Sequence, residues 1–180
     1  MFAICSCKEL VDGTTVKVGT NSGMLAFSAD SSRKLRIMSK DRNLMDDILK
    51  YNTNYDILNN GGQFDVDSKV QLSNVDLDGD GKKEFVVTIG APNTGLGIVS
   101  FIFTSELKYV GKVDGWDYMF LNKHRHIIAP HSALRWYDYY SYRNGEIKNL
   151  GEVDIDASQR PHIDHKKAEN RLYNELRNTK

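Results

Sequence analysis

Two short apolar runs near the middle of the chain constrain its fold more than any other feature. Residues 84–89 read EFVVTI and residues 98–103 read IVSFIF, and a glycine-containing segment separates them. Their apolar side chains are consecutive, so they point to both faces of an extended strand. Strands of this kind lie at the centre of a sheet that is covered on both sides. The two runs therefore predict the central strands of a buried sheet.

Further short strands are expected on both sides of this pair, at 14–18, 24–27, 35–38, 66–72, 108–113, 126–129, 134–142 and 146–153. The Asn144-Gly145 dipeptide between the last two is the strongest short hairpin signal. Strands at this spacing are typical of hairpins rather than of strand–helix–strand units. We expect a mainly β fold of antiparallel sheets or hairpins, arranged as a sandwich or as a small propeller-like structure.

Two short helices complete the expected fold, and one of them is C-terminal. The first covers residues 41–52 with Ser39 as its N-cap, and the second covers residues 165–177 with Asp164 as its N-cap. Apolar residues recur in both at helical spacing. They are Leu44, Met45, Ile48 and Leu49 in the first helix and Ala168, Leu172 and Leu176 in the second.

Composition narrows the class of protein. The chain has 180 residues, and 24 Lys and Arg balance 24 Asp and Glu, so it lacks the basic excess that is typical of nucleic-acid binders. No apolar run reaches the roughly 18 residues of a membrane-spanning helix. We expect a single β-rich domain over residues 10–180 and no nucleic-acid partner.

The segment before this domain, residues 1–9, reads MFAICSCKE. Its Ile4-Cys5-Ser6-Cys7 stretch resembles the end of a bacterial lipobox, and the resemblance implies that Cys7 carries a lipid. A lipoprotein of that kind works outside the inner membrane, in the periplasm or anchored at the outer membrane. The alternative is a disordered N-terminus with two incidental thiols, and the sequence leaves both open.

The most specific motif is the acidic loop DLDGDGKKE at residues 76–84. Carboxylates stand at its positions 1, 3, 5 and 9, and a glycine stands at position 6. Calcium takes about six to eight oxygen ligands, and the glycine permits the sharp turn that brings in a carbonyl at position 7. We expect a calcium site formed by the carboxylates of Asp76, Asp78, Asp80 and Glu84 and the carbonyl of Lys82.

The loop differs from an EF-hand because position 12 is Val87 rather than glutamate and a strand follows instead of a helix. The pattern D-x-D-x-D-G-x-x-E running into Phe85 resembles the calcium loop of FG-GAP and VCBS repeats, over residues 74–90. That resemblance implies a structural metal in a bacterial extracytoplasmic protein, although Glu84 replaces the usual aspartate. The alternative is an acid-rich turn without a metal. Magnesium fits less well, because it prefers a stiff, water-rich octahedron.

All five histidines lie in the last third of the chain. Three of them are close enough in sequence to be candidate zinc ligands through their imidazoles. No cysteine or carboxylate completes a known spacing, so exposed polar side chains are the favoured interpretation. The three candidate ligands are His124, His126 and His131, and the other two histidines are His162 and His165.

The strand expected at 134–142 is rich in aromatic residues. Tyr137 and Tyr139 fall on one of its faces, whereas Trp136, Tyr140 and Tyr142 fall on the other. One face packs in the core, and the other would form an exposed aromatic row suited to a protein partner. We expect Tyr137 and Tyr139 to form that row, and burial on both faces is the alternative.

Two functions from different classes follow from these features. The first is a non-enzymatic, extracytoplasmic binding module with a structural calcium loop, such as an inhibitor or immunity protein that blocks its partner. Extracytoplasmic calcium modules work at affinities of about 10⁻⁴–10⁻³ M, which cytosolic calcium would not fill. The second is a metal-dependent hydrolase that uses the late histidines. The sequence displays no catalytic motif that would favour the second.

Overall fold

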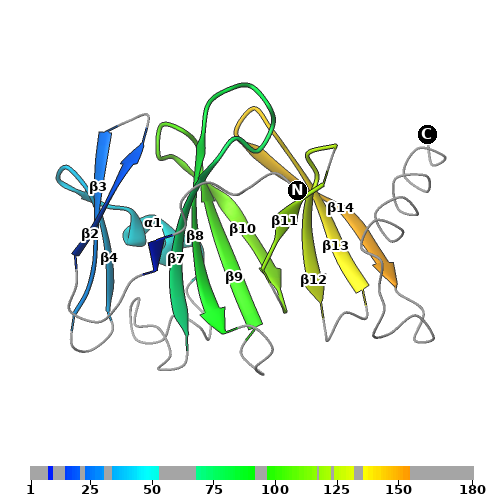
Figure 1. Cartoon of the computed structure of the whole chain (residues 1–180), viewed down its shortest axis with the longest axis horizontal. Helices are drawn as coiled ribbons and strands as arrows, with labels where there is room; N and C mark the ends of the chain where they lie inside the picture. The colour runs from blue at the N-terminus through cyan, green and yellow to red at the C-terminus, as the bar shows by residue number, and fades with distance from the viewer. Residues whose placement is uncertain are drawn as a thin grey trace.

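The computed structural model describes residues 8–9, 15–20, 23–30, 34–52, 68–91, 97–116, 118–122, 124–131 and 136–154. Over these residues the fold is mainly β, with three antiparallel sheets and one helix. The three sheets lie side by side (Figure 1). The second expected helix, at 165–177, lies outside the described residues.

The first sheet is an up-and-down meander in the order β2-β3-β4-β5. Its strands are β2 (Thr15–Thr20), β3 (Gly23–Ala29), β4 (Leu35–Ser39) and β5 (Arg42–Asn43). The hairpin expected between 14–18 and 24–27 is confirmed, because β2 pairs antiparallel with β3. Alternate residues of β3 and β4 are buried, so one face of this sheet packs in the core.

Helix α1 (Leu44–Tyr51) begins later than expected, and Ser39 is not its N-cap. A tight turn, in which Lys40 has a φ of 52°, instead pairs Ser39 with Arg42. The helix is capped by Asn43, whose side chain accepts a hydrogen bond of 3.3 Å from the backbone N–H of Met45. Because this side chain also accepts the N–H of Ile37, the cap fastens the helix to β4.

The central sheet has the order β1-β7-β8-β9-β10. Its strands are β1 (Lys8–Glu9), β7 (Lys69–Val75), β8 (Glu84–Ala91), β9 (Gly97–Phe103) and β10 (Tyr109–Gly115). The two apolar runs are the strands β8 and β9, which lie inside this sheet as predicted. Lys8 and Glu9, which the sequence analysis places in the N-terminal segment, pair with Leu72 and Gln71 at the edge of this sheet.

The third sheet has the order β11-β12-β13-β14. It consists of β11 (Phe120–Leu121), β12 (Ile127–His131), β13 (Trp136–Arg143) and β14 (Glu146–Asp154). The hairpin predicted at Asn144-Gly145 joins β13 to β14, and both residues have the positive φ that such a turn requires. A main-chain hydrogen bond from Trp116 to the carbonyl of Pro130 links this sheet to the end of β10.

The central sheet is buried on both faces, as its sequence predicted. On one face, Phe85 and Phe101 pack with the first sheet and α1. On the other face, Val86 and Ile102 pack with residues of the third sheet. Between these apolar positions, the hydroxyls of Thr88 and Ser100 hydrogen-bond each other at 2.9 Å across β8 and β9, which avoids unpaired buried polar groups.

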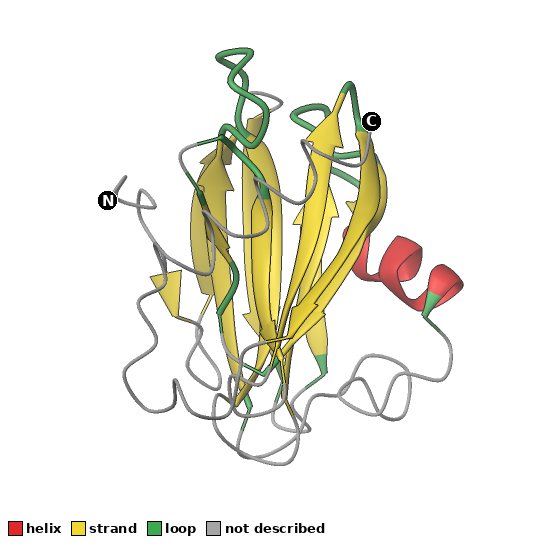
Figure 2. Ribbon diagram, turned by 90° about the vertical axis from the view of Figure 1, so that its right-hand side faces the viewer, coloured by secondary structure: helices red, strands yellow, loops and turns green. Residues whose placement is uncertain are grey.

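The helix lies at one side of the strands (Figure 2). Within the described part of the chain, no helix has the length and hydropathy to cross a membrane.

Candidate metal-binding loop

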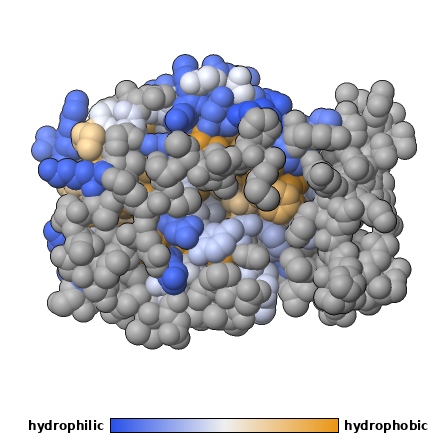
Figure 3. Space-filling view, viewed as in Figure 1, coloured by the Kyte–Doolittle hydropathy of each residue, from blue (hydrophilic) through white to orange (hydrophobic). Residues whose placement is uncertain are grey.

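The acidic motif forms the connection between β7 and β8, at residues 76–83. It rises above one end of the central sheet (Figure 1). Residues 79–83 are exposed, and the described surface at this end of the molecule is strongly hydrophilic (Figure 3). The motif is therefore a solvent-facing loop whose two ends are fixed by paired strands.

The loop winds around its own carboxylates. Asp76 accepts the backbone N–H of Gly79 at 2.6 Å on one carboxylate oxygen and that of Gly81 at 3.2 Å on the other. Asp78 accepts the N–H of Asp80 at 3.3 Å. Gly79 and Gly81 have φ values of +86° and +87°, which only glycine adopts readily. The sharp turn inferred for Gly81 is thus present, and Gly79 makes a second one.

Glu84 forms the floor of the loop. The residue is only 3 % exposed, and one carboxylate oxygen accepts the N–H of Leu77 at 2.8 Å. Burial raises the pKa of Glu84, and the hydrogen bond from Leu77 opposes the shift while the charge of Asp78 adds to it. Burial also raises the pKa of Tyr142, which lies on β13 of the third sheet, and the charge of Glu84 adds to this shift.

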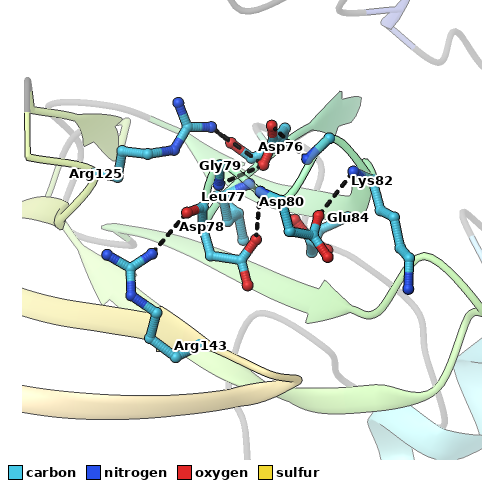
Figure 4. A network of polar contacts seen from close by, with 10 residues as sticks. Asp76, Leu77, Asp78, Gly79, Asp80, Lys82, Glu84, Arg125 and Arg143 are labelled. Carbon is cyan, nitrogen blue, oxygen red and sulfur yellow. Dashed lines mark hydrogen bonds and ion pairs between the residues drawn. The ribbon is translucent and has the colours of Figure 1, made fainter.

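Three of the predicted ligands converge. The carboxylates of Asp76, Asp78 and Glu84 each offer an oxygen, and these oxygens lie within 4.8 Å of one another. Asp80 is not part of this group, and its carboxylate accepts the backbone N–H of Lys82 at 2.7 Å (Figure 4). The role of the Lys82 carbonyl as a ligand stays a prediction.

Two arginines from the third sheet reach the loop from outside (Figure 4). Arg125 donates to the carbonyl of Asp76 and lies 3.2 Å from the carboxylate of the same residue. Arg143 donates to the carbonyl of Asp78 at 2.7 Å. The loop is therefore bound through its carbonyls by side chains that lie 49 and 65 residues further along the chain.

This arrangement fits a hard divalent cation. Carboxylate oxygens are the donors that calcium and magnesium prefer, and three carboxylates converge here. The Arg125 guanidinium neutralises part of this charge, since it lies 3.2 Å from the carboxylate of Asp76. One of the three belongs to the buried Glu84, where an uncompensated negative charge is costly. The three carboxylates are close enough together to hold a metal ion.

The histidines do not form a comparable group. The rings of His124 and His126 lie 6.4 Å apart before β12, whereas His131 lies at the far end of that strand. There His131 pairs with Asp138, with 3.0 Å between nitrogen and oxygen. Within the described residues, no set of three potential metal ligands includes a histidine. His162 and His165 lie outside the described part of the chain.

The expected partner-binding row on β13 is corrected by the structure. Tyr137 and Tyr139 are each 1 % exposed, so a partner of the folded domain does not reach their rings. On the opposite face, Tyr142 is buried and Tyr140 packs against the same cluster of buried residues. The alternative of burial on both faces holds for this strand. Cys7, the expected lipidation site, lies outside the described residues.

Arg125, Arg143 and Tyr142 were missed by sequence reasoning. The acidic motif is local in sequence, whereas these residues come from strands and turns that only the folded chain brings to it. No spacing or composition signal connects them to the loop. Comparison of the chain with family models, curated proteins and solved structures finds no match.

Proposed function

We propose that the protein is a non-enzymatic binding module that works outside the cytoplasm, with a calcium ion held in the loop at residues 76–84 as a structural clamp. The observation that carries the proposal is the convergence of Asp76, Asp78 and Glu84. A cation there would relieve the repulsion between these carboxylates and fix the β7–β8 hairpin. Calcium is the cation proposed, because a flexible loop with several carboxylates suits its large, irregular coordination shell.

The similarity of the loop to FG-GAP and VCBS loops gives the same interpretation. It rests on the motif alone, and the similarity of the whole fold to a sandwich or a propeller stays part of the proposal. The stacking of three antiparallel sheets around two buried clusters supports the sandwich.

Thermal unfolding of chelator-stripped protein tests the clamp. A ligand that binds only the folded state stabilises it by roughly 2.7 kcal/mol at a hundredfold excess over its Kd. Millimolar calcium is expected to raise the melting temperature, and Asp78→Ala is expected to remove this increase. Lys83→Ala is the control, since Lys83 lies in the same loop and is not a predicted ligand. A melting curve that calcium leaves unchanged would exclude the calcium clamp.

The alternative, a metal-dependent hydrolase using the late histidines, has less support. His131 is separated from His124 and His126 by the length of β12 and already pairs with Asp138. Zinc titration of the protein, followed by hydrolysis assays on ester and phosphoester substrates, separates the two functions. Zinc-dependent turnover that His124→Ala abolishes would favour the hydrolase.

We propose that a protein partner binds the backbone of an edge strand rather than the rings of Tyr137 and Tyr139. Strand β14 is the last in the order of the third sheet, and an edge strand is a common place for a partner to add a strand through backbone hydrogen bonds. An inhibitor or immunity protein is the proposed subtype. Retention of a partner from an envelope fraction, compared with and without calcium, tests this part of the proposal.

A further inference from the structure

The Asp-rich loop is one place where the third sheet contacts the central sheet. Two separate contacts meet there. Leu77, inside the loop, is buried in one cluster with Ile127 and Tyr142 of the third sheet. The second contact is the pair of arginines that bind the loop carbonyls.

Arg125 lies between β11 and β12, and its side chain reaches the loop from there. Its backbone has a φ of 62°, which is uncommon for a residue with a side chain. The buried Asn122 holds this segment, because its side-chain oxygen accepts the N–H groups of His124 and His126, both at 2.9 Å. Its carbonyl also accepts the N–H of Arg125 at 3.0 Å. A residue held in this way at a costly backbone angle is a candidate for a specific role.

The arginines and a cation would use different atoms of the loop. Both guanidinium groups bind carbonyls on its outer side, at Asp76 and Asp78. The carboxylates of the same residues converge on its inner side with Glu84. Only the carboxylate of Asp76 faces both, through its 3.2 Å contact with Arg125. A loop wound around a cation would therefore present the same carbonyls in the positions that the arginines need.

We propose that Arg125 and Arg143 make the loop a clasp, in which cation binding and the docking of the third sheet on the central sheet strengthen each other. This inference rests on the proposed calcium site. Coupling is reciprocal: if the cation favours the docked sheet, then docking raises the affinity for the cation by the same factor. Loss of the arginines, which hold the docked sheet to the loop, should therefore weaken cation binding. Arg125 and Arg143 are positioning residues, because they act on the cation through the loop.

The sign of an affinity change tests the clasp. Removing a nearby positive charge should tighten calcium binding if electrostatic repulsion alone operates. The clasp predicts the opposite for Arg125→Met, with a Kd for calcium raised about fivefold or more, the lower end of typical coupling. Lys83→Met, a matched loss of positive charge from the exposed side of the loop, is expected to leave the Kd unchanged or to lower it. Isothermal titration of chelator-stripped protein measures all three Kd values.

Hydrogen exchange supplies an independent measurement. In the wild type, calcium is expected to slow exchange of backbone amides in β12 and β13, and to leave those in β3 and β4 unchanged. The double variant Arg125→Met/Arg143→Met should lose the slowing in β12 and β13. If that variant does not fold, Arg125→Lys replaces it, since lysine keeps the charge but not the fork of N–H donors.

The outcomes separate this inference from the proposed function. Absence of calcium binding to the wild type overturns both. Calcium binding with a Kd that Arg125→Met leaves unchanged or lowers overturns the clasp alone, as does a calcium effect on β12 and β13 that survives in the arginine variants. Weaker binding in Arg125→Met, together with loss of protection in these strands, supports the clasp.

Discussion

Single residues determine the shape of the Asp-rich loop, and the two glycines in it have different neighbours. Gly79 and Gly81 share a left-handed backbone, but a Cβ atom on Gly79 would lie 3.1 Å from Cδ and Nε of Arg125. A Cβ atom on Gly81 would meet nothing within 4 Å. Gly79 therefore permits the turn and also leaves space for the side chain of Arg125, whereas Gly81 permits the turn only.

Replacement of each glycine by alanine should reveal this difference. Both variants carry the cost of a left-handed backbone, roughly 1–2 kcal/mol. Gly79→Ala is expected to cost more, because it also displaces Arg125. Urea denaturation measures the two costs, with Lys83→Ala as the surface control. In an Arg125→Ala background the excess cost of Gly79→Ala should vanish, and an equal cost for both glycines in the wild type would contradict the contact.

Tyr140 gives the domain a sensitivity to alkaline pH. Burial, together with the charges of Asp138 and Asp114, raises its pKa to about 12. Because the folded-state pKa lies above the unfolded value of about 10, the stabilisation is complete below pH 10. It is lost as the pH rises towards 12. Tyr140→Phe is expected to reduce the fall in unfolding free energy over this range, as measured by denaturation at several pH values.

At the scale of elements, β13 is a strand with two buried faces rather than the support of a binding surface. Tyr139 is enclosed on one face and Tyr142 on the other. Tyr139→Ala is expected to lower the unfolding free energy by about 3–5 kcal/mol, as truncation of a buried aromatic ring does. Lys148→Ala, on an exposed position of β14, should change it by less than about 0.5 kcal/mol. A small loss for Tyr139→Ala would show that this ring is not part of the core.

The pattern of apolar residues and the residues typical of turns made the strands predictable. The consecutive apolar residues of β8 and β9 indicated burial on both faces, and Asn144-Gly145 located a hairpin to the residue. The start of α1 was not predictable in this way, because the tight turn at Lys40 competes with the cap at Ser39 and the pairing of β5 with β4 decides between them. Propensity alone does not contain that tertiary pairing.

The candidate site was predictable in its local part only. The spacing of Asp76, Asp78 and Glu84 located three converging carboxylates, since alternate residues of a wound loop point inward. The same rule placed Asp80 with them, but its carboxylate lies outside the group and accepts the N–H of Lys82. The two faces of β13 were assigned correctly, yet alternation does not reveal whether a second layer covers the outer face.

At the scale of the whole molecule, the central sheet holds the other two in place, since each buried cluster includes one of its faces. Destabilising that sheet should therefore unfold the domain as one unit. Gly90→Ala is a sharp test, because a Cβ atom there would lie 2.3 Å from the carbonyl oxygen of Gly97, where β8 pairs with β9. Fluorescence and far-ultraviolet circular dichroism should report the same lowered denaturation midpoint. Two separated transitions would contradict a shared core.

The proposed anchor is tested on the intact chain in its native host. If Cys7 carries a lipid, the protein should fractionate with membranes, and Cys7→Ala should release it. More than one acyl chain on the cysteine gives stable attachment, at about 0.8 kcal/mol per buried CH₂. Recovery of the native protein from the cytosol would contradict both the anchor and the extracytoplasmic location.

The short strand β1 sets how far such an anchored domain could travel. Lys8 already pairs with Leu72, and successive Cα atoms are about 3.8 Å apart. A lipid on Cys7 would therefore be joined to the domain by almost no linker. The β1 edge of the central sheet would then be held close to the bilayer surface. This short attachment would also limit the tilt of the domain relative to the bilayer. A partner would have to come within one domain's width of the membrane, because the domain could not reach out to meet it.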